Sequence, residues 1–137
     1  MTEEKTIYAH VIENGESAYA VDIDVSGHRI KGDEPVEAGG ADLGPAPYDT
    51  LLAALGECTA MTVRWYARQK GLPLEKVEVK LSHRKGEGKK DFFTKEIILH
   101  GNSLTEEQRR KLIEIAAKCP VQRTLESGSV IETHAME

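Results

Sequence analysis

The sequence predicts an α+β fold, in which antiparallel strands combine with one long helix. Stretches of alternating apolar and polar residues come in neighbouring pairs separated by turn residues, a pattern typical of hairpins. One long helical pattern occupies residues 47–70, and two shorter ones follow near the C-terminus. Because turns rather than helical crossovers connect most strands, we expect an antiparallel sheet with a long central helix, in the order β-β-β-α-β-β-α-α-β.

The N-terminal part is predicted to form a meander of three strands. Asn14-Gly15 and Ser26-Gly27 are turn signals between alternating stretches. The second stretch alternates most clearly, because its aspartates fall on the face opposite its valines and isoleucine. The predicted strands cover residues 6–12, 18–25 and 28–32.

A loop and the longest helix come next. Three prolines and four glycines predict that residues 32–47 form no regular element. Pro47 suits the first helical position, Asp49 lies in the first turn, and Gly71 marks the end of the helix. The predicted apolar face contains Leu51, Leu55, Cys58, Thr62 and Trp65, widened by Leu52, Ala54 and Met61.

The C-terminal half is predicted to begin with a hairpin. Its strands are joined by a charged tip, and Thr105 with Gln108 has the form of a capping box that opens the next helix. The predicted elements are strands at 76–84 and 92–100, helices at 105–118 and 120–126, and a last strand at 128–136.

Bulk properties narrow the class of protein. A length of 137 residues suits a single domain, residues 1–137. The net charge of −5 argues against a nucleic-acid partner, because phosphate contacts need a basic face. No apolar run approaches a membrane span, and the charged N-terminal residues lack the pattern of a secretory signal. We therefore expect a cytoplasmic protein whose cysteines are normally reduced.

The position of Cys119 indicates a reactive thiol. Cysteine is often a small buried hydrophobic residue, and that interpretation stays open for both cysteines. If Pro120 begins a helix, however, Cys119 is its N-cap and faces unpaired amides and the positive end of the dipole. Both features favour thiolate, and Arg123 lies one turn further on.

Cys58 has the opposite setting. It falls on the apolar face of the long helix, where desolvation raises the pKa of a thiol. It would react only if a cation reached it from elsewhere in the fold. Arg29, Arg64 and Arg123 are the candidates.

The sequence predicts no metal and no cofactor. The two cysteines and five histidines match no zinc-ligand spacing. The loop carboxylates lack the spacing of a calcium loop. They are Asp33, Glu34, Glu37 and Asp42.

Two motifs carry a resemblance to a known family. The stretch GPAPYDTLLAALGECTAMTV, residues 44–63, resembles the cysteine-bearing central helix of the OsmC/Ohr superfamily of osmotically inducible and organic hydroperoxide resistance proteins. CPVQRTLESGSVIET, residues 119–133, resembles the second cysteine site and final strand of its non-Ohr branches. The resemblance extends over nearly the whole chain, because both motifs occur at this separation and in this order of elements.

The resemblance implies an OsmC-like fold built as an intertwined homodimer and a thiol peroxidase activity. Cys58 would attack the peroxide and become a sulfenic acid, and Cys119 would condense with it as a disulfide. A dithiol reductant would then reset the pair. This assignment of roles differs from the ranking by position, which makes Cys119 the more acidic thiol.

One departure from the family pattern leaves a second interpretation open. Peroxide-reducing branches carry a glutamate ten residues before the first cysteine, paired with an activating arginine. Here that position is Tyr48, and Asp49 is rotated by about 100° on the helix. Arg29 is the residue closest to the role of that arginine. The alternative to a peroxidase is an OsmC-like binding or interaction module with slow cysteines.

Overall fold

The computed structural model describes residues 5–136, which divide into two compact units between Leu51 and Leu52. Each unit is described by itself. Within the described residues, every helix is too short or too polar to cross a membrane. The prediction of one domain over residues 1–137 stays a prediction.

The first unit contains a three-stranded antiparallel sheet in the order β1-β2-β3. Ser26 and Gly27 both have positive φ, as in the two-residue turns that suit the twist of a hairpin. The turn sets a register in which Ile23 is opposite Ile30. The strands are β1 (Ala9–Glu13), β2 (Val21–Val25) and β3 (His28–Gly32).

The meander is confirmed, and the predicted starts of its first two strands are wrong. The first strand begins at Ala9 rather than at residue 6. The second begins at Val21, because the chain bends over residues 15–19 and Ser17 accepts hydrogen bonds from the amides of Tyr19 and Ala20.

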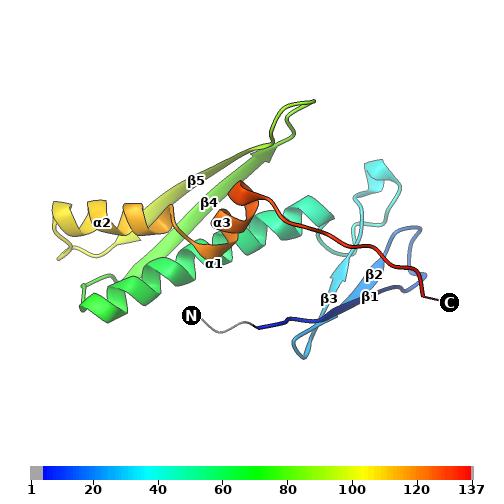
Figure 1. Cartoon of the computed structure of the whole chain (residues 1–137), viewed down its shortest axis with the longest axis horizontal. Helices are drawn as coiled ribbons and strands as arrows, with labels where there is room; N and C mark the ends of the chain where they lie inside the picture. Colours follow the sequence, from blue (N-terminus) through cyan, green and yellow to red (C-terminus); the bar gives the residue numbers. More distant parts are fainter. Residues whose placement is uncertain (1–4, 137) are drawn as a thin grey trace. The chain divides into compact units, whose positions relative to one another are not determined.

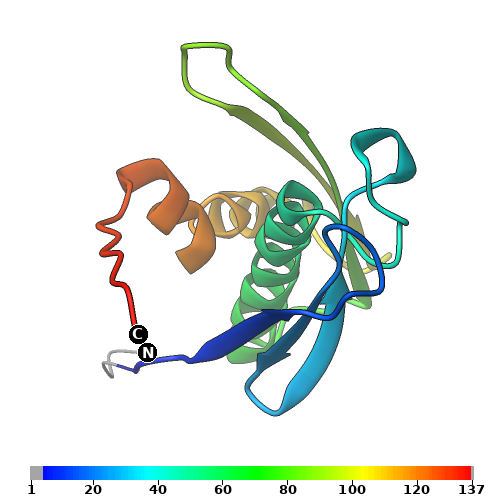
Figure 2. The same cartoon turned by 90° about the vertical axis from the view of Figure 1, so that its right-hand side faces the viewer.

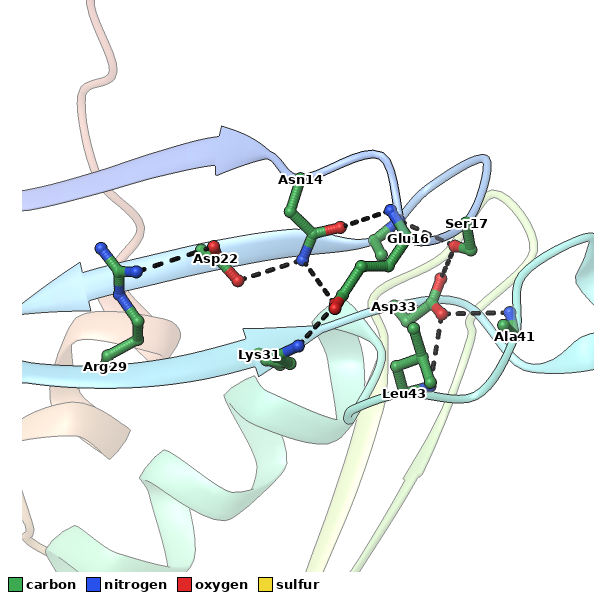
Figure 3. Close-up of polar contacts among 10 residues, drawn as sticks. Asn14, Glu16, Ser17, Asp22, Arg29, Lys31, Asp33, Ala41 and Leu43 are labelled. Atoms are coloured by element: carbon green, nitrogen blue, oxygen red, sulfur yellow. Dashed lines mark hydrogen bonds and ion pairs between the residues drawn. The ribbon is translucent and has the colours of Figure 1, made fainter.

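The loop after β3 is organised by Asp33, which is buried (Figure 3). Its carboxylate accepts hydrogen bonds from the hydroxyl of Ser17 and from the amides of Glu34, Ala41 and Leu43. These bonds offset the burial of Asp33 and hold its pKa below the usual value. The prediction of a loop without any regular element is corrected by one turn of 3₁₀ helix, η1 (Val36–Ala38).

The second unit holds the core of the protein. Helix α1 (Pro47–Lys70), which begins in the first unit, is followed by a hairpin of β4 (Lys76–Arg84) and β5 (Phe92–His100). Helices α2 (Glu106–Ala116) and α3 (Pro120–Ser127) follow. The hairpin tip extends beyond the helices of this unit (Figures 1 and 2). The buried cluster is formed by Val63, Ala67, Leu74, Leu104, Leu112 and Ala116.

The buried face of α1 differs from the predicted one. Trp65 and Met61 are 57% and 62% exposed, whereas a stripe with four-residue spacing is buried. Gly56 belongs to that stripe, and a Cβ at its position would lie 2.6 Å from a methyl group of Leu81. Apolar content alone had not distinguished the two faces. The buried residues are Leu55, Gly56, Thr59, Val63 and Ala67.

Both C-terminal helices are confirmed with small shifts at their ends. Thr105 caps α2 and forms the predicted capping box with Gln108. The predicted final strand is wrong for the described residues 128–136, which contain no strand. Val130 and Ile131 are 92% and 86% exposed, because no strand among residues 5–136 pairs with them.

Candidate active site formed by two thiols

Cys119 lies where the sequence predicts it, at the N-cap of α3. Its backbone is extended, with φ −67° and ψ 147°, and Pro120 follows as the first helical residue. The side chain is completely buried. Cys119 makes no side-chain capping hydrogen bond, but its carbonyl accepts from the amide of Arg123 at 3.1 Å.

The start of α3 also contacts the other cysteine. The amide of Val121, in the first turn of α3, donates a hydrogen bond to Sγ of Cys58 at 3.4 Å. Helices α1 and α3 therefore lie against each other at this point (Figure 1). Cys58 is half-buried and Cys119 is fully buried, and both are free thiols. The two cysteines that are 61 positions apart in the sequence are thus brought together at one helix terminus.

A polar chain reaches Cys119 from the hairpin. Nζ of Lys95, on β5, donates to Oγ1 of Thr59 at 2.9 Å and to the carbonyl of Ala116 at 2.7 Å. Oγ1 of Thr59 lies 3.4 Å from Sγ of Cys119 and 2.8 Å from the carbonyl oxygen of Leu55. Thr59 is fully buried, so this hydroxyl has only these neighbours to satisfy it.

The two thiols have opposite pKa shifts. Burial acts to raise the pKa of Cys119, but it is outweighed by hydrogen bonding from Thr59, the Gln122 amide and the Cys58 thiol, together with the charge of Lys95. The pKa of Cys119 therefore lies below its usual value. Burial raises the pKa of Cys58, and a negative charge on Cys119 raises it further, although the Val121 amide opposes this.

These directions agree with the ranking made from the sequence. The N-cap thiol is the more acidic one, and the thiol on the apolar helix is the less acidic one. The ionisation of one thiol affects that of the other, because a negative charge on Cys119 raises the pKa of Cys58.

The arginines and the aspartate proposed from the sequence have other contacts. Arg29 forms a two-pronged ion pair with Asp24, at 2.8 and 2.9 Å, in the first unit. Asp49 accepts from the amide of Ala46 at 3.0 Å and so caps the start of α1. Arg64 donates to the carbonyls of Leu74 and Glu75.

Arg123 is exposed on α3. The charge that acts on the thiols within the second unit is instead that of Lys95, whose pKa is lowered by burial against the opposing effects of Cys119, Cys58 and Glu126.

The roles of Lys95 and Thr59 were not predicted from the sequence, although each is a polar residue at an inward position of its strand or helix. The inward face of β5 has a period of two, and Lys95 is a charged residue on that face between Phe93 and Ile97. Thr59 lies four residues after Leu55 on the stripe that proves to be buried. A polar residue at a buried position needs a partner, and that requirement points to both.

A cavity of about 420 Å³ adjoins the polar chain. Lys95 and Gln122 line it, and Oε1 of Gln122 is buried without a hydrogen-bond partner among the described residues. Most of the other lining residues are apolar, including Leu55, Phe93, Ile97, Ile113 and Leu125.

Comparison with protein families gives one match, to the OsmC-like protein family, over residues 39–134. The chain belongs to the OsmC-like family. The match includes both cysteines, Thr59 and Lys95. It confirms the superfamily that the two motifs indicate, while the non-Ohr branch stays a prediction. A search of curated proteins found no match.

Solved structures confirm that this OsmC-like protein has the fold of its family. An OsmC-like protein from Mycoplasma pneumoniae has a TM-score of 0.75 and 18% identity, covering 90% of this chain and 89% of the other. An organic hydroperoxide resistance protein from Legionella pneumophila has a TM-score of 0.65 and 17% identity, covering 90% and 91%. The organic hydroperoxide resistance protein OhrB of Bacillus subtilis has a TM-score of 0.59 and 16% identity, covering 88% and 90%.

Proposed function

We propose that this OsmC-like protein is a thiol-dependent hydroperoxide reductase that uses Cys58 and Cys119. The observation that carries the proposal is the meeting of two free thiols at the start of α3, where Val121 donates to Cys58. Cys58 attacks the peroxide, because it is the less buried thiol and a substrate reaches it more readily than the fully buried Cys119.

The first step needs no base other than the partner thiol. In the reactive form the negative charge of the pair lies on Cys119, whose pKa is lowered, and Cys119 takes the proton of Cys58 as the Cys58 sulfur attacks the terminal peroxide oxygen. The O–O bond breaks, Cys58 becomes a sulfenic acid, and the leaving alkoxide takes a proton from water to give an alcohol. Sulfur is oxidised by two electrons and the peroxide is reduced by two.

The second step joins the two sulfurs. The Cys119 thiol attacks the sulfenic sulfur of Cys58, its proton leaves with the displaced hydroxide as water, and a disulfide forms. A dithiol reductant then restores both thiols by exchange.

We propose an organic hydroperoxide as the substrate. The cavity beside Lys95 is lined mostly by apolar side chains and has room for a small hydrocarbon group. Similarity to organic hydroperoxide resistance proteins supports this choice. The proposal includes a cytoplasmic location and a homodimer, as the resemblance implies.

A second candidate is a binding or interaction module with slow cysteines. It is favoured by the raised pKa of Cys58 and by Tyr48 at the position of the family's glutamate. A nucleophile with a raised pKa has little thiolate at neutral pH, and this lowers its rate of attack.

Peroxide consumption by reduced protein separates the two candidates. With cumene hydroperoxide, we expect the wild type to lose both thiols and Cys58→Ser to lose neither. Cys119→Ser lacks the thiolate that takes the proton of Cys58, so it should react more slowly and stop at a sulfenic acid on Cys58 that dimedone traps. If both wild-type thiols survive and Cys58→Ser changes nothing, the protein is not this peroxidase.

A further inference from the structure

Lys95, which is half-buried, and Thr59, which is buried, form a polar chain that ends at Cys119. Nζ of Lys95 is 2.9 Å from Oγ1 of Thr59, and that oxygen is 3.4 Å from Sγ of Cys119. The carbonyl of Ala116, at the end of α2, accepts a second hydrogen bond from Lys95 at 2.7 Å. Contacts with α1 and α2 therefore hold the ammonium group of this β5 residue in place.

We propose that Lys95, acting through the hydroxyl of Thr59, is the positioning residue that stabilises negative charge on Cys119. This role is an addition to the two-cysteine reaction proposed above. It contributes to function only if that proposed reaction takes place. It places the positive charge on the hairpin strand β5, in a chain whose candidate arginines within this unit have other contacts or are exposed.

The hydroxyl of Thr59 links the charge of Lys95 to the ionisation of Cys119. It has one proton, which it donates to the carbonyl of Leu55 while Cys119 is a thiol. When Cys119 ionises, the hydroxyl turns its proton to the sulfur, and its oxygen still accepts from Lys95. A donor that itself accepts from a cation is a stronger donor, so each bond in the chain strengthens the next.

The other ionisable groups near Cys119 come from two helices. Cys58 on α1 influences the ionisation of Cys119, and the negative charge of Glu126 on α3 acts on Lys95. Glu126 also accepts a hydrogen bond from the side chain of Gln122 at 3.1 Å. The negative charge of Glu126 partly offsets the stabilisation of the Cys119 thiolate by Lys95. The backbone amides of α3 stabilise that thiolate in the same direction as Lys95.

The alternative role for Lys95 is purely structural, as a cation that ties β5 to the end of α2. Under that role, replacing Lys95 would change stability but not the ionisation of Cys119 beyond what any lost surface charge would do. A titration separates the two roles, and it needs no peroxide. Its result therefore stands whether or not the protein proves to be a peroxidase.

The experiment follows thiolate absorbance at 240 nm against pH in reduced Cys58→Ser protein, so that only Cys119 is observed. Adding Lys95→Met should raise the midpoint of the Cys119 titration. At a fixed pH below that midpoint, the thiolate fraction should fall by about tenfold for each pH unit by which the midpoint rises. Lys95→Arg should restore most of the shift. Lys80→Met, on the exposed face of the same hairpin, is the matched control and should leave the midpoint unchanged.

Thr59 supplies the second pair of variants. Thr59→Val removes the hydroxyl at nearly constant volume and should raise the midpoint, whereas Thr59→Ser should not. If Lys95→Met fails to fold, the comparison of Thr59→Val with Thr59→Ser still tests whether this polar chain stabilises the Cys119 thiolate. Equal midpoints for Lys95→Met and Lys80→Met, or for Thr59→Val and Thr59→Ser, would overturn the proposal.

Discussion

At the scale of single residues, the position of Cys119 was predictable and its surroundings were not. Proline after a cysteine, at the start of a helical pattern, was enough to predict an N-cap thiol with a lowered pKa. The contacts of Thr59 and Lys95 depend on residues far apart in the sequence, and only packing brings them together. The roles of Cys58, Arg29, Asp49 and Arg123 in the reaction stay proposals.

The lowered pKa of Cys119 makes a prediction about stability and pH. A thiol whose pKa is lower in the folded state stabilises the fold above its unfolded pKa, and this contribution is lost as pH falls through the folded pKa. Reduced wild-type protein should therefore gain free energy of unfolding relative to Cys119→Ala as pH rises from acidic values to the ordinary thiol pKa of about 8.5. Denaturant unfolding under reducing conditions measures the difference, and a difference that is constant across this range contradicts the shift.

At the scale of elements, the sequence predicted most strands and helices because their patterns are local. Turn residues, the capping box and Pro120 are all short-range signals. The buried face of α1 and the final segment were predicted wrongly, because both depend on partners elsewhere. Trp65 is apolar but exposed, and residues 128–136 have the composition of a strand without a sheet edge to pair with.

The packing of α2 against the core gives a prediction at this scale. Leu112 is fully buried within the cluster that includes Val63 and Leu104. Leu112→Ala should lower the free energy of unfolding by about 2–5 kcal/mol, because it removes buried methyl groups and leaves a cavity. Ile113→Ala, at the neighbouring and partly exposed position, is the control and should cost much less. Equal losses for the two variants would contradict the assigned face of α2.

At the scale of the whole molecule, the chain leaves much apolar surface uncovered. Met61 and Trp65 are exposed on α1, beside the half-buried Ala60 of the same helix and Val77 of β4. In the first unit, both strands at the edges of the sheet expose apolar side chains. A small sheet needs a packed face for stability, so these surfaces favour the proposed homodimer.

The dimer is tested by sedimentation equilibrium. We expect the wild type to be a dimer at micromolar concentration, and Trp65→Glu to shift the population toward monomer because it buries a charge in the contact. Gln69→Glu adds the same charge on the last turn of the same helix and is the control. A wild type that is monomeric throughout this range contradicts the prediction.

We propose that Cys58 and Cys119 act as one redox unit. Reduced protein is treated with one equivalent of cumene hydroperoxide, blocked with an alkylating reagent, and mapped by mass spectrometry without reduction. We expect a peptide pair joined by a disulfide between Cys58 and Cys119 of the same chain, formed in proportion to the alcohol released. Recovery of both cysteines in alkylated form, with the peroxide unconsumed, would contradict it.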